Sequence, residues 1–465
     1  MCDIGQPNSD SLMLLKERKV VFGRGRRVRI DIATIGFLIA CAWVTNAQEP
    51  PPAQVDSPLE SQPIVAPQAT PVIELNPPND AGIQAAPGAA AASYSPQPRR
   101  FQYDLRLTIR GVYDDNINIS HFNRVSDYYV AIEPEIILGF GDVVGRQDNY
   151  ILLDYIPTGL LYVDHSENDA IEHRIHLEGG HRFSRLTLSL SQDVNILDGA
   201  NLGDTTDTTG HQVNLDVSAR TRLNLYTTYA KASYDLSAKT FLTGEFNAVI
   251  YDYVNFISSE MYSGGLYLNY NYSPKLVIGF GGTGGFNLVD DPNPDQTFEQ
   301  ANVRLVYQAT GKLSLNASGG VEFRQFAHNS RGEHISPVFD IGAHYQPFDG
   351  TDITLTAGRR TLNSGFFPDQ DFTATNVTIG IRQRLLQRIS LGFTAGYENS
   401  DYFNTVEGVS ATRRDNYFFV EPSIDITITR FWTAGVYYLH RQNDSVLDSF
   451  TFYDNQVGVR TTLHF

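Results

Sequence analysis

The chain has few cysteines, few lysines and no capped, helix-length apolar stripe. Both cysteines, Cys2 and Cys41, lie within the first 47 residues, so we expect no disulfide framework in the rest of the chain. The apolar run at residues 32–44 is shorter than the ~20 residues that a membrane-crossing helix needs. The formal net charge is -17, which argues against nucleic acid as a partner.

Residues 1–47 have the organisation of a secretory signal peptide. Seven Lys and Arg residues lie between positions 16 and 29, the apolar run follows, and Thr45 and Ala47 supply small residues for a cleavage site. The same residues leave open a start at Met13, a membrane anchor, a lipidated Cys41 and a twin-arginine signal. We predict a cleaved signal peptide and therefore export from the cytoplasm.

Residues 48–100 are rich in Pro, Ala and Gln and have few bulky apolar side chains. Such a segment cannot bury enough apolar surface to offset its loss of conformational entropy. We predict a disordered periplasmic tether, which could reach about 150 Å if fully extended. A periplasmic or cell-wall partner bound through this tether is one interpretation, and a linker without a partner is the other.

From residue 101 onward, apolar and polar residues alternate with a period of two. In residues 313–324 the odd positions carry Leu, Ala, Gly, Val and Phe, and the even positions carry Ser, Asn, Gly, Glu and Arg. Neighbouring side chains of a strand point to opposite faces, so each strand has one apolar and one polar face. The same pattern recurs in 103–110, 389–398 and 418–428. Strands this long, with charged residues on the polar face, are typical of transmembrane barrels rather than of soluble sandwiches.

The connections between these strands alternate between short and long. Short turns are expected near residues 142–148, 183–185, 237–239, 273–275, 310–312, 349–351, 386–388 and 429–430. Longer segments rich in Asp, Asn, Gly and Pro occupy 114–126, 198–210, 290–296 and 404–414. This asymmetry predicts an all-β fold for residues 101–465, an antiparallel up-and-down barrel of about 18 strands, with 16 as the alternative.

The weak point of this strand count is the stretch Gln212–Ser237. Val213, Leu215 and Val217 alternate with polar residues, but residues 220–222 disturb the phase before a new run begins at Leu223. The stretch can therefore be one long strand or two.

The chain ends in a strand whose last residue is aromatic. In residues 457–465 one face carries Val457, Val459, Thr461, Leu463 and the terminal Phe465. This pattern resembles the C-terminal signal by which bacterial outer-membrane barrels are recognised for assembly, so Phe465 is the expected assembly signal.

The segment Tyr113-Asp114-Asp115-Asn116-Ile117, together with Phe465, resembles the beta-barrel porin type 2 family. The resemblance would extend over residues 101–465. It implies an outer-membrane barrel, and some members of that family resemble proteins of exopolysaccharide export clusters. It does not supply a substrate.

Charged residues on the polar faces are the candidates for lining a lumen. They are Arg106, Arg110, Arg304, Glu322, Arg324, Arg360, Arg382, Arg384, Glu398, Asp425 and Arg460. Arg106, Arg110 and Arg460 should meet where the first and last strands close the barrel. They would form either wall arginines neutralised by facing acids, which is the interpretation we prefer, or a basic patch that attracts anions.

No motif indicates catalysis, a cofactor or a metal ion. The loop with Asp114, Asp115, Asn116 and Asn118 is rich in oxygen ligands but lacks the glycine and terminal glutamate of an ordered calcium loop. We interpret this and similar loops as solvated acidic loops. There is no Gly-x-Ser-x-Gly nucleophile motif, and we predict that the protein is not an enzyme.

These observations predict a porin-like channel in the bacterial outer membrane for passive passage of hydrophilic solutes. The alternatives are an exit channel for exopolysaccharide and a structural or adhesive barrel with a closed lumen. The expected partners are outer-membrane lipid, lipopolysaccharide and the barrel assembly machinery.

Overall fold

The computed structural model describes residues 101–143, 149–199, 213–327 and 332–465. The predicted signal peptide and tether, residues 1–47 and 48–100, lie outside the described residues. No helix in the described part of the chain has the length and hydropathy that a membrane-crossing helix needs.

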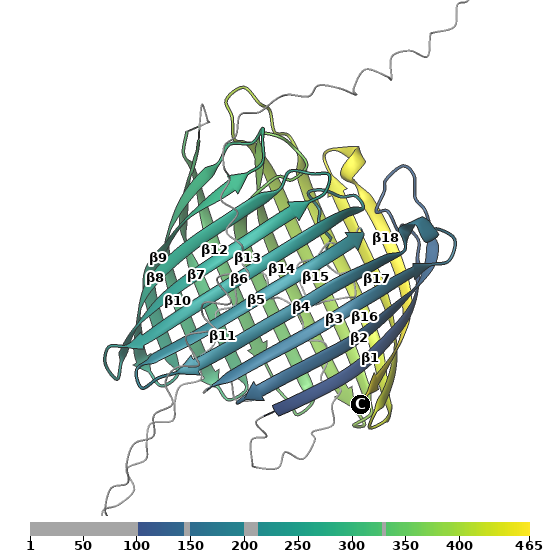
Figure 1. Cartoon of the computed structure of the whole chain (residues 1–465), viewed down its shortest axis with the longest axis horizontal. Helices are drawn as coiled ribbons and strands as arrows, with labels where there is room; N and C mark the ends of the chain where they lie inside the picture. The colour runs from purple at the N-terminus through teal and green to yellow at the C-terminus, as the bar shows by residue number, and fades with distance from the viewer. Residues whose placement is uncertain (1–100, 144–148, 200–212, 328–331) are drawn as a thin grey trace, which may run out of the picture. The chain divides into compact units, whose positions relative to one another are not determined.

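The described residues form one closed antiparallel sheet of eighteen strands in an up-and-down order (Figure 1). Two short 3-10 helices, η1 and η2, lie in the connections. The elements are β1 Phe101–Asp114, β2 Asp127–Gly141, β3 Tyr150–Tyr162, η1 Ser166–Asn168, β4 Ala170–Arg182, β5 Leu186–Gly199, β6 Thr221–Asp235, β7 Thr240–Tyr253, β8 Ser259–Ser273, β9 Leu276–Val289, β10 Gln296–Thr310, β11 Leu313–Phe326, β12 His334–Tyr345, β13 Thr351–Asn363, β14 Gln370–Leu385, β15 Ile389–Asn404, β16 Arg414–Thr429, β17 Trp432–Ser445, η2 Asp448–Phe450 and β18 Phe452–His464.

The ring closes by pairing of β1 with β18. Arg106 lies opposite His464 and Arg110 opposite Arg460 in an antiparallel register. The backbone N–H of Phe465 donates a hydrogen bond to the carbonyl of Leu105 at 2.9 Å. In Figure 1 the C-terminus accordingly lies beside the start of β1. The structure thus confirms the predicted antiparallel closure and the count of eighteen strands rather than sixteen.

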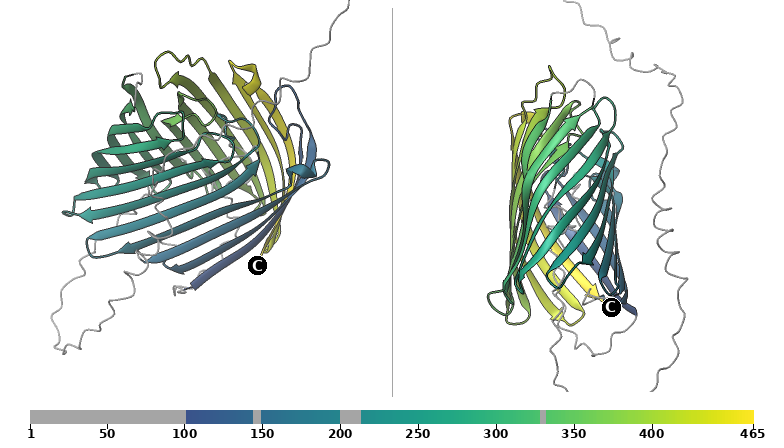
Figure 2. Two further views of the ribbon diagram at one scale, coloured as in Figure 1. Left: turned by 45° about the horizontal axis from the view of Figure 1, so that its top comes forward. Right: turned by 90° about the vertical axis from the view of Figure 1, so that its left-hand side faces the viewer.

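Alternation decides which side chains face outward. In β1, Leu105 and Ile109 are exposed on the outer face, whereas Arg110 and Val112 are buried on the inner face. In β11, Val321 and Phe323 point outward while Glu322 and Arg324 are buried. A barrel with an apolar outer face and charged residues on its inner face has the surface of a transmembrane barrel. The tilted strands form a continuous wall in both views of Figure 2.

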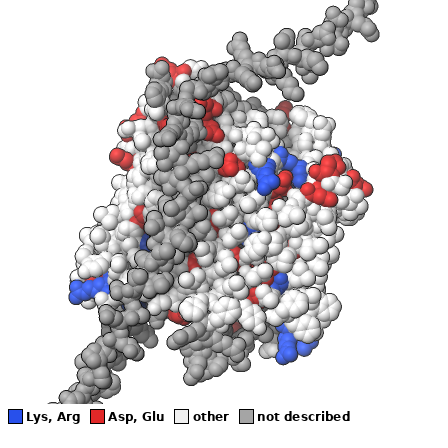
Figure 3. Space-filling view, viewed as in Figure 1, with Lys and Arg blue, Asp and Glu red and all other residues white. Residues whose placement is uncertain are grey.

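The two rims differ in the side chains that they expose. Exposed aromatic side chains lie at the strand ends and short turns of one rim, as an aromatic girdle would. They are Phe101, Tyr103, Phe140, Phe183, Tyr234, Tyr270, Tyr272, Tyr345, Phe348, Phe431, Trp432 and Phe465. Where no grey atoms cover the face shown in Figure 3, its middle is mostly uncharged, and acidic side chains, with some basic ones, gather toward the rim of long loops.

The stretch Gln212–Ser237 differs from either prediction made for it. Only Thr221–Asp235 forms a strand, β6, and residues 213–220 form a compact turn segment with no strand. Leu215 and Val217 are buried in this segment. Their alternation therefore reflects burial inside the barrel rather than a face toward lipid.

Candidate functional site

Residues 213–220, which we call the inward segment, cross the inside of the barrel. The segment precedes β6, yet the side chain of Asp216 contacts Tyr402 of β15, which lies nine strands further round the eighteen-strand ring. Half the circumference separates these two strands, so the segment spans the lumen near the rim of long loops. Leu215 packs there with Val112, Tyr129 and other buried residues of β1, β2, β16, β17 and β18.

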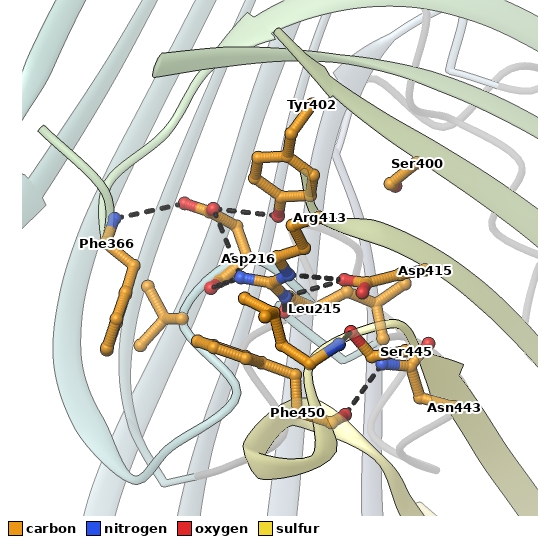
Figure 4. Close-up of polar contacts among 12 residues, drawn as sticks. Leu215, Asp216, Phe366, Ser400, Tyr402, Arg413, Asp415, Asn443, Ser445 and Phe450 are labelled. Carbon is orange, nitrogen blue, oxygen red and sulfur yellow. Dashed lines mark hydrogen bonds and ion pairs between the residues drawn. The ribbon is translucent and has the colours of Figure 1, made fainter. Parts of the chain in front are cut away.

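The carboxylate of Asp216 is held by four donors, from β15 and from the connection between β13 and β14. The hydroxyl groups of Ser364 and Tyr402 donate to Oδ1 at 2.7 and 2.9 Å. The backbone N–H groups of Gly365 and Phe366 donate to Oδ2 at 2.5 and 3.3 Å. Figure 4 shows Tyr402 and Phe366 on either side of this carboxylate. A carboxylate with several donors is fixed in position.

Arg413 holds the backbone of the same segment. Its guanidinium donates to the carbonyls of Leu215 at 2.5 Å and Asp216 at 2.9 Å, and it pairs with Asp415 at 2.6 Å. The ring of Phe450 lies 3.6 Å from the guanidinium carbon. We call Asp216, Arg413 and the partners Ser364, Tyr402 and Asp415 the anchor; Figure 4 labels all of these except Ser364. Because Arg413 and Asp415 are almost completely buried, the anchor is an ion-pair network shielded from solvent.

The residues on either side of Asp216 are tied to the wall from which the inward segment comes. Arg220 donates to the hydroxyl of Tyr162 at 3.2 Å and to the carbonyl of Asn168 at 3.1 Å. The Asn214 amide donates to the hydroxyl of Tyr253. Both ends of the segment are therefore tied to the wall beside β6, and Asp216 between them is held by the anchor.

The predicted lumen candidates all lie on the inner faces of their strands. Four of the candidates form two ion pairs with each other: Arg460 with Asp425 at 2.7 Å, and Arg324 with Glu322 at 2.9 Å. Arg360 attracts the Glu398 carboxylate. Arg382 is attracted by Asp425 and repelled by Arg460 and Arg384. Whether these residues line a conducting pathway stays a prediction.

The remaining predicted arginines pair with acids that were not candidates. Arg106 pairs with Asp104 at 2.5 Å and Glu135 at 3.3 Å, and Arg110 pairs with Glu133 at 2.6 Å. Arg304 forms a bidentate ion pair with Glu245, with both N···O distances at 2.6 Å. Each seam arginine therefore has an acidic partner, as the neutralised interpretation describes, and the wall has no unpaired basic patch at Arg106, Arg110 and Arg460.

The interpretation of the first long loop as a solvated acidic loop is wrong for two of its residues. Asp114 is 3% exposed and Asn116 is fully buried. The Asn116 amide donates to the carbonyls of Ser120 and Tyr453, so the loop packs against β18 instead of extending into solvent.

Sequence reasoning missed the anchor. Asp216, Arg413 and Tyr402 belong to distant parts of the chain, and no local motif connects them. The one available signal was the disturbed phase at residues 220–222, which marks the point where the chain leaves the barrel interior and enters β6.

Comparison with known proteins gives similarity to solved structures of proteins from Pseudomonas aeruginosa. The outer membrane protein OpdK is 13% identical with a TM-score of 0.42, and the match covers 78% of this chain and 99% of that one. OccK3 (OpdO) is 14% identical with a TM-score of 0.41, covering 78% and 96%. OccK2 (OpdF), solved in complex with glucuronate, is 13% identical with a TM-score of 0.41, covering 78% and 98%. No family model matches the chain, and no curated protein matches it.

Proposed function

We propose that this barrel is a porin-like channel through which small hydrophilic solutes diffuse passively, without catalysis. The observation that carries the proposal is the inner wall: a closed ring of eighteen strands turns its charged side chains inward and its apolar side chains outward. A ring of this size encloses more space than wall side chains alone fill, and a charged inner surface is favourable for hydrated solutes.

The inward segment favours small solutes over a polymer. An exit channel for exopolysaccharide would need a clear path for a continuous chain of sugars. Here residues 213–220 cross the barrel and are fixed by the anchor on one side and by Arg220 on the other. This segment divides the lumen near the long loops, so the path past it is narrower than the barrel itself.

Planar-bilayer recording of the refolded full-length protein tests the proposal. We expect discrete conductance steps, together with swelling of proteoliposomes in monosaccharide but not in long oligosaccharide. Absence of conductance steps from protein with an intact heat-modifiable fold would favour a structural or adhesive barrel. Passage of long oligosaccharides would favour the export channel.

The outer membrane is the location that this architecture fits, because closed barrels with an aromatic girdle are built into that membrane.

The barrel assembly machinery is the proposed partner of Phe465, whose side chain is 74% exposed at the end of β18 and therefore accessible. Lipopolysaccharide is the proposed neighbour of the acidic loop rim. Deletion of Phe465 should lower the amount of membrane-inserted protein in cells, and an unchanged amount would overturn the assembly role.

A further inference from the structure

The pairing of β12 with β13 covers only the half of β12 near the turn rim. The ladder between them runs from that rim to the pair Phe339–Arg359 and stops there. Both neighbouring ladders, β11–β12 and β13–β14, continue further toward the loop rim. Residues 334–338 of β12 and residues 360–363 of β13 are therefore not paired with each other, and we call this part of the wall the upper joint. Pro337 lies in it, and proline is tolerated where a strand lacks a ladder partner.

The two sides of the wall overlap at the upper joint. The Asn287 amide of β9 donates to the side-chain oxygen of Asn363 in β13 at 3.2 Å. The Arg324 guanidinium of β11 donates to the carbonyl of Thr361 in β13, also at 3.2 Å. Asn287 and Arg324 are buried on the inner faces of their strands, so the upper end of β13 lies on the lumen side of β9 and β11. Side chains therefore close this joint in place of backbone hydrogen bonds.

The side of β13 and β14 that faces away from the lumen changes from apolar to polar at this joint. Nearer the turn rim it carries exposed apolar residues such as Leu355 and Val377. The next two cross-strand pairs on the same side are polar, and they are Arg359–Thr375 and Thr361–Thr373. Paired residues on one face of a sheet are direct neighbours. One guanidinium and three hydroxyl groups thus form a compact group, which we call the polar block.

Two donors of the polar block lack an acceptor in the described part of the chain. Nη1 of Arg359 donates to the hydroxyl of Thr375 at 2.7 Å, but Nε of Arg359 is buried without a hydrogen-bond partner. The hydroxyl of Thr361 also has no partner, and Thr361 is only 4% exposed. Asp401 of the adjacent β15 pairs with Arg414, so it does not neutralise Arg359. Buried polar groups without partners are unfavourable, and an anionic oxygen would satisfy both donors.

We propose that the polar block binds the phosphate group of an outer-leaflet lipid. Arginine matches phosphate in charge and in donor geometry, and a threonine hydroxyl adds a further donor. Exposed Leu355 and Val377 lie on the turn-rim side of the block, so the acyl chains of a lipid bound at Arg359 extend over them toward the middle of the membrane. This is the orientation of a lipid in the outer leaflet, because the long loops face outside. The site does not depend on the passage of solutes through the lumen.

The test measures binding of lipopolysaccharide to full-length protein refolded in a non-ionic detergent. Fluorescence anisotropy of labelled lipopolysaccharide gives the dissociation constant. The competitors are unlabelled lipopolysaccharide, the same lipid with its phosphate groups removed, and inorganic phosphate. The dephosphorylated lipid should compete at least about tenfold more weakly than the intact lipid, because hydrogen bonds to a charged group are lost. Inorganic phosphate at the same concentration should not compete, because it lacks acyl chains.

Three variants separate the polar block from the rest of the outer surface. Arg359→Gln should weaken binding at least about tenfold. Thr361→Val replaces a hydroxyl that has no partner by a methyl group, so it should weaken binding without lowering the temperature at which the folded band on a gel converts to the unfolded band. The matched control is Arg222→Gln, which removes an exposed arginine at the loop-rim end of β6 and should keep the wild-type affinity.

Three results would overturn the proposal. One is equal affinity of wild type and Arg359→Gln or, if that variant does not fold, of wild type and Thr361→Val. Another is an equal loss of affinity in Arg222→Gln, which would assign binding to general charge attraction. The third is competition by inorganic phosphate as strong as that by lipopolysaccharide, because the polar block would then bind a soluble anion. Conductance steps test the channel separately, so failure of one proposal is distinguishable from failure of the other.

Discussion

The inner wall is packed at the rim of long loops and open at the rim of short turns. At the loop rim, the side chains of Arg413 and Asp415 are 1% and 0% exposed. At the turn rim, the paired Arg106 and Asp104 side chains are 19% and 40% exposed. The strands alternate in the same way at both rims, so the wall does not cause the difference. The inward segment and the long loops cause it, by filling one end of the barrel.

Ion pairs of the same chemical type, arginine with aspartate, therefore contribute differently to stability at the two rims. Breaking a buried pair leaves a charge in a poorly solvated place and costs about 3–5 kcal/mol. An exposed pair contributes about 0–1 kcal/mol, because water screens it. The anchor should therefore control the position of the inward segment, whereas the turn-rim pairs should chiefly set the local field.

The largest effect is expected for Arg413→Ala. The substitution leaves Asp415 buried without its cation and removes two hydrogen bonds from the inward segment. We expect a loss of about 3–5 kcal/mol in docking of the segment, a larger single-channel conductance and faster proteolysis within 213–220. The control is Arg414→Ala, because Arg414 is exposed and pairs with exposed Asp401. Equal conductance of the two variants would show that the anchor does not narrow the lumen.

A second comparison, between the outer and inner faces, is tested at the middle of β14. Val377 is exposed on the outer face, and its neighbour Thr378 lies on the inner face. Val377→Arg should destabilise the membrane-inserted barrel by about 2–4 kcal/mol, whereas Thr378→Arg should be tolerated. Urea titration of folding into lipid vesicles measures both. Equal losses would mean that the faces are assigned incorrectly.

Along the closing seam, replacing Arg106, Arg110 and Arg460 together by Ser should change selectivity. The substitution leaves the carboxylates of Asp104, Glu133, Glu135 and Asp425 without these partners. Reversal potentials in a salt gradient should shift toward cations, and more so at low salt, where screening is weak. Addition of Asp425→Asn should reverse part of the shift. If the variant and the wild type have the same reversal potential at low salt, these three residues have only a structural role.

The smallest effect is a pH dependence of the anchor. Burial raises the pKa of Asp216 above its ordinary value, although Arg413, Ser364 and Tyr402 act in the opposite direction. The docked segment thus holds the Asp216 proton more tightly than the released segment. Docking is therefore strongest below the released pKa of about 3.9 and weakens as the pH rises through the raised value.

Conductance should accordingly be lower near pH 4 than at neutral pH, because pH 4 is close to the ordinary aspartate pKa of about 3.9 and the segment is then docked more firmly. Asp216→Asn keeps the side chain neutral at every pH and should flatten this profile. A wild-type profile in the variant would assign the pH dependence to other groups.

Much of the fold could be predicted because alternation is a local property. The period of two in residues 313–324 is enough to assign an outer and an inner face, since lipid on one side and charge on the other require it. The same period misleads at residues 213–219. There, Leu215 and Val217 are buried against the inside of the barrel, and an apolar side chain is suited to either environment.

The sequence by itself determined the antiparallel barrel with polar inner faces, because strand alternation and turn chemistry are both written in neighbouring residues. Only the tertiary structure decided that Asp216 crosses the lumen to Tyr402 and Arg413, and that Asp114 is buried beside Asp454. The physical reason is ring closure. It joins residues more than 300 positions apart at the seam, and an inward loop meets the opposite wall through contacts that no local pattern contains.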